Sequence, residues 1–556
     1  MEEISAILKQ IIKEKFPEVF ATDSGFTVEV TTPPEIAETN NFRADAATNV
    51  AMKLAGTLSK QTGKKHNPRD IAETLKTAFL TACPDKSPEL AKAQVEIAGP
   101  GFLNFMLPDA YFRQKLADLA TNFEKNISCD KYKDKVVVTE FSDPNPFKVL
   151  HVGHLYTSIV GESISRLIEF AGGTVHRVNF GGDVGLHVAK TLYALQKPDF
   201  TIEDIAKAYV AGTRLYEEDE TAKTAITKLN QQIYQIAEQN LHDSELANNY
   251  WRGRELSYQY FDDFYARIGV KFEKYYPEST VASTGLATVR AHIPAVYQES
   301  DSAVVFKGED YGLHTRVFIN QAGLPTYEAK DVGLIFAKDA DYHFDESVVI
   351  TGNDIIEYMK VVLKSVEQYA PELVAKTRHL THGNVRLPGN EKMSSRKGNF
   401  IKAVDVLEMA PLDAIKYSFL KYKIGGNIEF SPEESVSLSG NSGPYLQYSA
   451  VRAKHILNKL ATPPAAREYP YNDFEIKLLK KLTDYRAVLR TAVEEKAPHL
   501  ICNFLFELAQ EFSRFYEHCQ VAGDACEAER AKMVKVFYQI MEHGLNLLSI
   551  QIPEKM

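Results

Sequence analysis

Residues 136–154 have the sequence VVVTEFSDPNPFKVLHVGH, in which an apolar run leads through a proline-rich loop to a His-Val-Gly-His tetrad. The run Val136–Phe141 predicts a buried strand, and Leu155–Phe170 carries apolar residues at helical spacing. A Gly-Gly pair ends that helix, and Thr174–Phe180 is the next predicted strand. A helix between two strands at this spacing predicts an α/β fold with a doubly wound, Rossmann-like parallel sheet.

Length and composition favour a multidomain globular protein. The 556-residue chain exceeds the roughly 250–300 residues at which single cores stop growing. Its hydrophobic content of 44% and charged content of 25% are ordinary for soluble proteins. No apolar stretch approaches the roughly 20 residues that a membrane helix needs. The early acids and helical periodicity of the N-terminus argue against a secretory or transit peptide, so we expect a cytoplasmic protein without a membrane segment.

The cysteines and the net charge bear on cofactors and partners. The five cysteines show no C-x-x-C pair and no companion histidine at zinc-site spacing, so reduced thiols are expected rather than a metal or disulfide framework. The net charge of −10 does not by itself indicate a nucleic-acid binder. An acidic total can still contain basic stripes, so the charge weakens an RNA partner without excluding one.

The sequence pattern divides the chain into three predicted domains. Residues 1–112 form an α+β N-terminal domain that closes with a strand broken by a Gly-Pro-Gly turn. Residues 113–431 form the α/β domain, with a polar helical insertion near 195–300 between two halves of the sheet. Residues 432–556 show helical periodicity without strand signals, which predicts an all-α domain. Two strands are predicted after the insertion, Arg316–Asn320 and Ser347–Thr351.

The loop and tetrad that follow the first strand are the predicted ligand site. Ligands of doubly wound sheets bind at the carboxyl ends of strands, beside helix N-termini that attract phosphate. Residues 143–146, Asp-Pro-Asn-Pro, can neither continue a strand nor begin a regular helix, so they form a loop at this edge. His151 and His154 then lie at i, i+3 on the first helical turn and point to the same side. Gly153 leaves room for a flat group such as adenine against the backbone.

A second motif, Lys392-Met393-Ser394-Ser395-Arg396, lies in a loop rich in Gly and Asn. Cations on a mobile loop suit pyrophosphate, because they can close on the triphosphate and stabilise charge on the leaving group. The alternative for this motif is a solvated basic turn, and the alternatives for the His tetrad are a metal site or two unrelated surface histidines. The presence of both motifs in one chain favours phosphate binding, and the lack of a third ligand disfavours a metal.

The two motifs together resemble the paired ATP-binding motifs of class I aminoacyl-tRNA synthetases. Four further segments resemble arginyl-tRNA synthetases in particular: Glu140–Lys148, Thr326–Asp331, Gly443–Tyr448 and Pro553–Met556. Residues 95–105 look like the end of that family's extra N-terminal domain, so the resemblance covers essentially the whole chain. It implies a ligase of protein biosynthesis that activates L-arginine with ATP and Mg²⁺. The arginyl group then passes to the 2′-hydroxyl of the terminal adenosine of tRNA(Arg).

The resemblance also implies residue roles at the ATP site. His151 and His154 would stabilise the transition state at the α-phosphate, and Lys392 would hold the leaving pyrophosphate. Many family members lack that lysine and rely on one upstream of the first motif, a place that Lys148 occupies here. We therefore expect the two lysines to share one task. The remaining implied ATP-binding residues are Gly153, Ser394, Ser395, Arg396 and Gly352.

For the amino acid, a guanidinium needs planar carboxylate partners, preferably bidentate ones. Glu140 ends a predicted strand, and Asp331 shares one helical face with Tyr327 at i−4. The resemblance assigns these three residues to the arginine side chain and Asn145 to its α-amino group or carbonyl. The alternatives are that Asp331 is an ordinary surface acid and that Tyr327 belongs to the core.

The chain departs from the family pattern at four places. Val184 stands where many relatives have tryptophan, and His187 where glutamine is common. A frequent substrate-site glutamine is replaced near Ile355, and a tryptophan of some relatives is Gln520 here. These departures concern the details of the arginine pocket and one base contact rather than the class of reaction.

A tRNA partner calls for aromatic side chains against unpaired bases and cations against phosphates. The resemblance places Tyr445, Tyr516 and Met556 around the anticodon loop, although aromatics at helical spacing are also typical of packed cores. The N-terminal domain is expected at the tRNA elbow, through Asn41–Asn49 and Gly99–Asn104.

Two other interpretations compete with an arginine–tRNA ligase. A class I synthetase for another amino acid is disfavoured by the set Glu140, Tyr327 and Asp331. A catalytically silent, synthetase-like RNA-binding protein is disfavoured by the two intact motifs. The family is mostly monomeric, so we expect a monomer.

Overall fold

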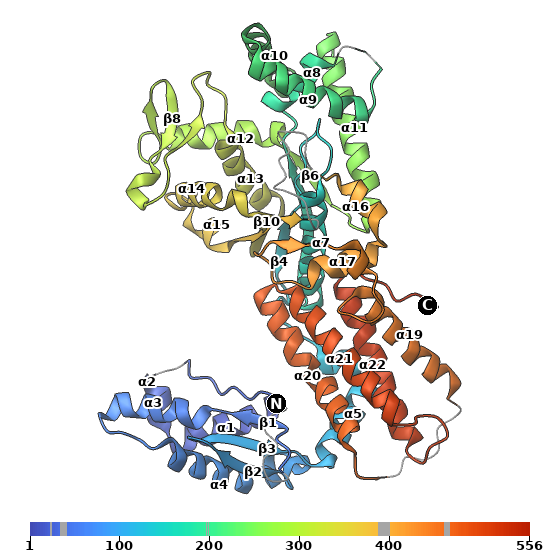
Figure 1. Ribbon diagram of the computed structural model, residues 1–556. Helices are drawn as coiled ribbons and strands as arrows, with labels where there is room; N and C mark the ends of the chain where they lie inside the picture. The colour runs from blue at the N-terminus through green and yellow to red at the C-terminus, as the bar shows by residue number, and fades with distance from the viewer. Residues whose placement is uncertain (23–24, 34–41, 196, 198, 387–400, 461–467) are drawn as a thin grey trace.

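The computed structural model (Figure 1) describes residues 1–22, 25–33, 42–195, 197, 199–386, 401–460 and 468–556. A small N-terminal unit lies beside one end of a C-terminal helical bundle, and the parallel sheet lies beyond the other end of that bundle. The Thr32 hydroxyl donates to Asp484 (2.9 Å) and Lys480 pairs with Asp45 (2.7 Å), so the first unit contacts the bundle directly. None of the helices in the described ranges is long and apolar enough to span a membrane.

The N-terminal unit is a three-stranded antiparallel sheet covered by helices. Its strand order is β1-β3-β2, and the β2–β3 turn contains Gly99 and Gly101, both with positive φ. Apolar side chains of α1, α3 and α4 pack onto the sheet in one continuous core. The elements are α1 (Glu2–Lys15), α2 (Pro17–Thr22), β1 (Ala46–Thr48), α3 (Val50–Thr62), α4 (Pro68–Lys86), β2 (Gln94–Ala98) and β3 (Phe102–Met106).

The central sheet has five parallel strands in the order β11-β10-β4-β5-β6, which confirms the predicted doubly wound α/β fold. The chain first adds β5 and β6 on one side of β4, then crosses to add β10 and β11 on the other side. The topological switch point, where such sheets bind ligands, therefore lies between β4 and β10. The strands are β4 (Val136–Glu140), β5 (Thr174–Gly181), β6 (Lys274–Pro277), β10 (Glu346–Gly352) and β11 (Thr377–His382).

Helix α7 (Val152–Phe170) begins at the His tetrad and is buried on nearly every side. One side packs on the sheet so closely that a Cβ at Gly161 would lie 2.2 Å from the Phe141 ring. On the other side, the Ser163 hydroxyl donates to the Leu547 carbonyl (3.0 Å) and Arg166 bonds Asn546 (2.8 Å). The helix therefore lies between the sheet and the C-terminal bundle.

The strands predicted at Arg316–Asn320 and Ser347–Thr351 both form, but they lie in different sheets. β9 (Arg316–Ile319) belongs to a separate antiparallel sheet with β7 (Gln298–Ser300) and β8 (Ala303–Phe306). This short sheet packs Phe306 and Phe318 against Tyr297, in an apolar cluster that also includes Val138 and Val349 of the central sheet. A four-residue apolar run fits either sheet, and its antiparallel partners decide between them. The other predicted strand is β10 and does lie in the central sheet.

The helical insertion between β5 and β6 has its own core, and it begins and ends earlier in the chain than the predicted range near 195–300. It contains α8 (Leu186–Ala194), α9 (Ile202–Glu218), α10 (Glu220–Gln239) and α11 (Glu245–Ile268). Phe147, from the loop after β4, enters this core and stacks on Tyr250 (ring centroids 6.2 Å), which ties the insertion to the ligand-binding edge of the sheet. The helices that follow are α12 (Glu278–Ala291), α13 (Tyr327–Tyr342), α14 (Ile356–Glu367) and α15 (Pro371–Lys376).

Within residues 432–460 and 468–556 the regular elements are all helices: α18 (Pro432–Ser435), α19 (Gly443–Lys459), α20 (Asp473–Glu495), α21 (Pro498–His518) and α22 (Glu527–Leu547). Their apolar faces form one core that is continuous with α7. Between the central sheet and this bundle lie β12 (Val385–Arg386), α16 (Ala403–Met409), α17 (Leu412–Leu420) and β13 (Ile428–Glu429).

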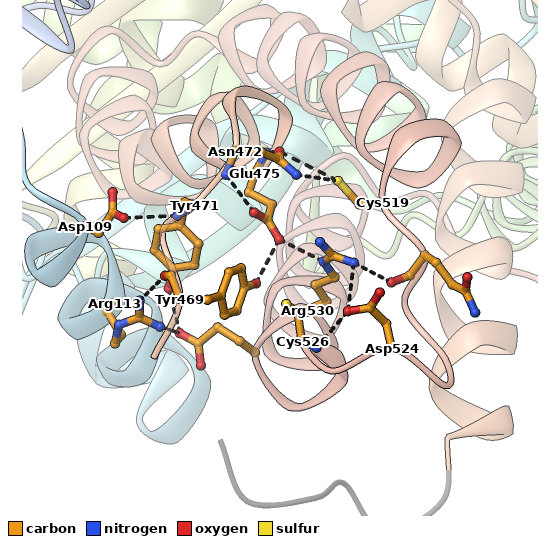
Figure 2. Close-up of polar contacts among 12 residues, drawn as sticks. Asp109, Arg113, Tyr469, Tyr471, Asn472, Glu475, Cys519, Asp524, Cys526 and Arg530 are labelled. Atoms are coloured by element: carbon orange, nitrogen blue, oxygen red, sulfur yellow. Dashed lines mark hydrogen bonds and ion pairs between the residues drawn. The ribbon is translucent and has the colours of Figure 1, made fainter. Parts of the chain in front are cut away.

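The connector out of the N-terminal unit, α5 (Asp109–Thr121) and α6 (Phe123–Ile127), is fixed to the bundle by a polar cluster (Figure 2). The Arg113 guanidinium lies 4.7 Å from the centroid of the Tyr471 ring and pairs with Glu529 (3.4 Å). The Tyr471 hydroxyl donates to the same Glu529 (2.6 Å), and Asp109 accepts from the Tyr471 backbone N–H (3.0 Å). These contacts set how the N-terminal unit is held against the bundle.

Candidate active site

The loop between β4 and α7 lies at the switch point and has a strained backbone. Ser142, Asp143 and Phe147 all have positive φ (75°, 49° and 66°), which is uncommon for residues other than glycine. Polar anchors compensate for this strain. Ser142 bonds the Tyr265 hydroxyl (2.8 Å), Asp143 accepts from the Phe180 N–H (2.9 Å), and the Phe147 N–H donates to the Ser257 hydroxyl (3.0 Å). The loop is therefore held in one shape before any ligand arrives.

His151 and His154 form a capping box at the start of α7. The Gly153 N–H donates to His151 Nδ1 and the His151 N–H donates to His154 Nδ1, both at 3.1 Å, and the rings stack at 3.8 Å. A backbone N–H can only donate, so each Nδ1 is the unprotonated nitrogen. A neutral ring then carries its proton on Nε2, which is a hydrogen-bond donor. The two rings point to the same side, as their i, i+3 spacing predicts.

Both histidines are neutral near pH 7. Burial lowers the pKa of His151 to about 4 and the pKa of His154 well below its usual range, and the positive charge of Lys148 acts in the same direction. The flat group that lies against Gly153 is the His151 imidazole, because a Cβ at Gly153 would lie 2.8 Å from that ring. Gly153 thus makes room for a protein ring where the sequence had suggested adenine.

Both imidazoles line a cavity of about 660 Å³ together with Asn145, Lys148 and one face of α9. The Lys148 ammonium lies 5.1 Å from the centroid of the Tyr209 ring on α9. Residue 401 returns beside the tetrad, since the Val152 N–H donates to the Ile401 carbonyl (3.0 Å). The predicted residues Lys392, Ser394, Ser395 and Arg396 lie outside the described residues. Gly352 ends β10, the strand next to β4.

The predicted guanidinium ligands come together, each with a partner that the sequence did not reveal. Glu140 forms a buried ion pair with Lys338, whose ammonium also donates to the Ser347 hydroxyl (3.1 Å). Asp331 accepts a hydrogen bond from the Tyr358 hydroxyl. Burial raises the pKa of the Asp331 carboxyl to about 8, and the negative charge of Glu140 contributes to this shift despite the Tyr358 hydrogen bond. The negative charge of Glu140 therefore acts on the Asp331 carboxyl.

Lys338 and Tyr358 were missed for different reasons. Lys338 lies seven residues after Asp331 on α13, on the same helical face, so helical spacing could have identified it. Tyr358 comes from α14, and no local pattern links it to Asp331.

Tyr327 and Asn145 complete the predicted amino-acid site. Tyr327, at the start of α13, is 53% exposed, so it is not a core residue. The Asn145 Oδ1 accepts from the Gly182 N–H (2.8 Å), which fixes the orientation of the amide. Its Nδ2 remains as a donor on the side of the cavity that Asn145 lines.

Three of the residues that depart from the family pattern are either buried or hydrogen-bonded to a neighbour in the sequence. Val184 is buried in the core of the insertion. His187 is buried, and its Nε2–H donates to the Gly182 carbonyl (2.7 Å). Gln520 is exposed and donates to the Ala522 carbonyl (2.9 Å). Ile355 lies just before α14, the helix that carries Tyr358. In the described ranges no group of three or more His, Cys, Asp or Glu could hold a metal ion.

The predicted tRNA-binding aromatics differ in exposure. Tyr445 is half-buried against Phe506, whereas Tyr516 and Met556 are 43% and 53% exposed. The exposed Tyr448 lies next to Arg452, whose guanidinium is 4.7 Å from that ring and 5.2 Å from the Tyr516 ring. A cation between two exposed aromatic rings is the type of surface that stacks unpaired bases. In the N-terminal unit, Asn41 lies outside the described residues and Phe102 is 40% exposed in the β2–β3 turn.

Comparison with known proteins agrees with this geometry. Residues 117–419 match the family described as tRNA synthetases class I (R), catalytic domain. Residues 2–107 match the arginyl tRNA synthetase N terminal domain, and residues 446–556 match the DALR anticodon binding domain. The chain is 26% identical to an arginine–tRNA ligase of Treponema denticola, over 88% of this chain and 90% of that protein. It is also 26% identical to one of Bacteroides fragilis, over 82% and 86% of the two chains.

Solved structures share the fold. An arginyl-tRNA synthetase from Thermus thermophilus aligns over 99% of both chains with a TM-score of 0.76 at 22% identity. One from Plasmodium falciparum aligns over 100% of this chain and 99% of that one, with a TM-score of 0.78 at 19% identity. The catalytic-domain match alone spans more than half of the 556 residues. The chain therefore belongs to the arginyl-tRNA synthetase family of class I tRNA synthetases.

Proposed function

We propose that the chain is an arginine–tRNA ligase. The carboxylate of L-arginine attacks the α-phosphorus of ATP, which releases pyrophosphate and gives arginyl-adenylate. The 2′-hydroxyl of the terminal adenosine of tRNA(Arg) then attacks the arginyl carbonyl and releases AMP. One observation carries the proposal: two neutral imidazoles with oriented Nε2–H donors line a cavity at the switch point together with Lys148.

The histidines are assigned to the α-phosphate. In the five-coordinate transition state, the attacking carboxylate oxygen and the leaving pyrophosphate oxygen are apical, and preorganised donors stabilise the negative charge on the equatorial non-bridging oxygens without rearranging. The N-terminus of α7 adds a positive partial charge at the same place. Lys148 supports the same anion from the cavity wall. Lys392, Ser394, Ser395 and Arg396 are proposed to hold the β- and γ-phosphates, Gly352 to contact ATP, and Mg²⁺ to enter bound to the triphosphate.

Arginine is proposed to bind with its guanidinium at Asp331. Glu140 is already paired with Lys338, so Asp331 is the carboxylate with more remaining acceptor capacity. Glu140 adds negative potential, and Tyr327 covers the pocket from its exposed position at the start of α13. The Asn145 Oδ1 is taken by Gly182, so its Nδ2 is the group that meets the substrate. This assigns Asn145 to the carbonyl side of arginine rather than to its α-amino group.

The tRNA is proposed to span all three units. Residues 432–556 hold the anticodon loop through Tyr445, Tyr516, Met556 and the Tyr448–Arg452 surface, and residues 1–112 hold the elbow. Residues 113–431, with the helical insertion between β5 and β6, carry the chemistry. We also propose that the enzyme is a monomer and works in the cytoplasm, as expected for this family.

ATP–pyrophosphate exchange with each amino acid, with and without tRNA(Arg), tests the proposal. Exchange with arginine that depends on tRNA supports the ligase. Exchange with a different amino acid overturns the specificity. Exchange with none, together with tRNA binding, identifies a silent RNA-binding protein instead.

A further inference from the structure

The active-site cavity has a second wall that comes from the insertion. Helix α9 contributes Lys207, Val210, Ala211 and Arg214 to the lining. These residues lie at i, i+3, i+4 and i+7, so they form a single stripe along one face of the helix. The opposite wall carries Lys148, His151 and His154. A helix of the insertion therefore lines the same cavity as the tetrad.

The position of α9 is fixed by its other face. Ile205, Ala208 and Gly212 are buried, and a Cβ at Gly212 would lie 1.9 Å from the Lys190 carbonyl oxygen on α8. Only glycine permits this approach, so α9 is held tightly on α8. The stripe that faces the cavity has no part in this packing, since Lys207, Val210 and Arg214 are exposed. The side chains of this stripe are therefore available to bind a ligand.

Among the described residues, the charged groups that line the cavity all have one sign. They comprise Lys207 and Arg214 of α9, Lys148 and Lys402, beside the two histidines and Tyr209, and no described carboxylate is among them. In the described ranges, the side chains of Lys207 and Arg214 form no hydrogen bond or ion pair with any other residue. The acids of α9 that follow Arg214 do not line the cavity, and Asp204 is engaged by Lys197 (2.8 Å). Unneutralised cations around a concave surface concentrate anions.

We propose that Lys207 and Arg214 bind a chain of phosphates from the side of the cavity opposite the His tetrad. This inference rests on the proposed function and adds to it two substrate-binding residues that belong to neither ATP motif. The shared ligand chemistry is a row of phosphate groups, supplied by the triphosphate of ATP or by the phosphodiesters of the tRNA 3′ end. The exposed Val210 and the half-buried Ala211, between the two cations, provide an apolar surface for the attached ribose or base.

The test uses the full chain with the pair Lys207→Gln and Arg214→Gln, separately and combined. Lys228→Gln and Arg290→Gln are matched controls, because both side chains are exposed on helices outside the cavity. Binding of ATP with Mg²⁺ is measured by calorimetry without tRNA. Binding of intact tRNA(Arg) and of the same tRNA without its terminal CCA is measured by fluorescence anisotropy at one fixed salt concentration.

The double variant is expected to lose about tenfold in affinity for one ligand, as removal of charge-assisted hydrogen bonds predicts. Weaker ATP binding with normal tRNA binding assigns the cations to the triphosphate. Weaker binding of intact tRNA with unchanged binding of trimmed tRNA assigns them to the 3′ end. The charge-conserving pair Lys207→Arg and Arg214→Lys should retain most of the affinity in either case.

Two results overturn the inference. One is a double variant that binds ATP and intact tRNA as tightly as the two controls do. The other is an equal loss for intact and trimmed tRNA, which places the cations on RNA outside the cavity. Failure of the proposed function is a separate result, because it appears in the unsubstituted protein as an absence of arginine-dependent exchange.

Discussion

The hydroxyl of Tyr358 on α14 donates a hydrogen bond to the carboxylate of Asp331 on α13. Arg316 lies over the same tyrosine ring, 5.2 Å from its centroid, so the ring is held from a second side. The Asp331 carboxylate is thereby oriented before a guanidinium arrives. Tyr358 lies three residues after Ile355, one of the positions at which the sequence departs from the family pattern.

Replacing Tyr358 with Phe should raise KM for arginine about tenfold, because a hydrogen bond to a charged group is worth roughly 1.5–3 kcal/mol. The effect on kcat should be small, since the interaction does not reach the reacting atoms. Steady-state aminoacylation measures both constants. Tyr297→Phe, which removes a buried hydroxyl bonded to Ser365 and Tyr369, is the matched control and should leave KM unchanged. A purely structural role for Tyr358 would give similar kinetics in both variants.

Arginine binding should strengthen as the pH rises through about 8. Burial raises the pKa of Asp331 to about 8, so below this pH much of the free enzyme carries a neutral carboxyl that cannot pair with a guanidinium. The dissociation constant for arginine should fall between pH 7 and 9 and then level off. Asp331→Asn should bind arginine weakly with a flat profile over this range. A wild-type profile as flat as that of the variant would contradict the assignment.

The same shift has a consequence for stability. The folded state holds the Asp331 proton up to about pH 8, whereas the unfolded chain releases it near its usual value of 3.8. The folded protein therefore binds more protons between these values, and this group lowers stability as the pH rises. Denaturant unfolding without ligand should show Asp331→Asn gaining stability relative to the parent chain from pH 5 to pH 8. No change in the difference between the two chains would count against the shifted pKa.

Two substitutions of His151 can separate its role as the N-cap of α7 from its role as a hydrogen-bond donor to the substrate. Asparagine is a good N-cap and can accept the hydrogen bond that Nδ1 accepts, but it has no donor at the position of Nε2. His151→Asn should keep the melting temperature while kcat falls on the order of 10²–10³-fold. His151→Ala should lose activity and also about 1 kcal/mol of stability with the cap. Equal melting temperatures for the two variants would show that the cap is energetically unimportant.

Lys148→Ala and Lys392→Ala should each leave partial ATP–pyrophosphate exchange, and the double variant should be far worse than either. The reason is that Lys148 lines the cavity while Lys392 belongs to the second motif, so each can support the same polyphosphate. The comparison of single and double variants measures their coupling. Near-complete loss in both single variants would show that the lysines have separate tasks.

Local pattern was sufficient for the parts of the fold that lie close together in the sequence. The strand, loop and helix from Val136 to Phe170 follow from apolar spacing and two prolines, and the parallel sheet follows from the next strand. Local pattern could not assign Arg316–Ile319 to its sheet, because strand partners are set by distant residues. The same limit applies to the site. Lys338 pairs with Glu140, which is 198 residues away in the sequence, and Lys148 lies against Tyr209 of the insertion.

Helix α7 has no free side, since the sheet covers one flank and the C-terminal bundle the other. Separating the sheet from the bundle would expose the apolar side chains of α7 to water, and the free-energy cost is proportional to the area exposed. Residues 113–556 should consequently melt in a single transition and resist separation by limited proteolysis. Cutting the connector α5–α6 should release only the N-terminal unit. The domain that we propose to form arginyl-adenylate and the domain that matches the anticodon binding family should thus unfold as one unit, because both pack on helix α7.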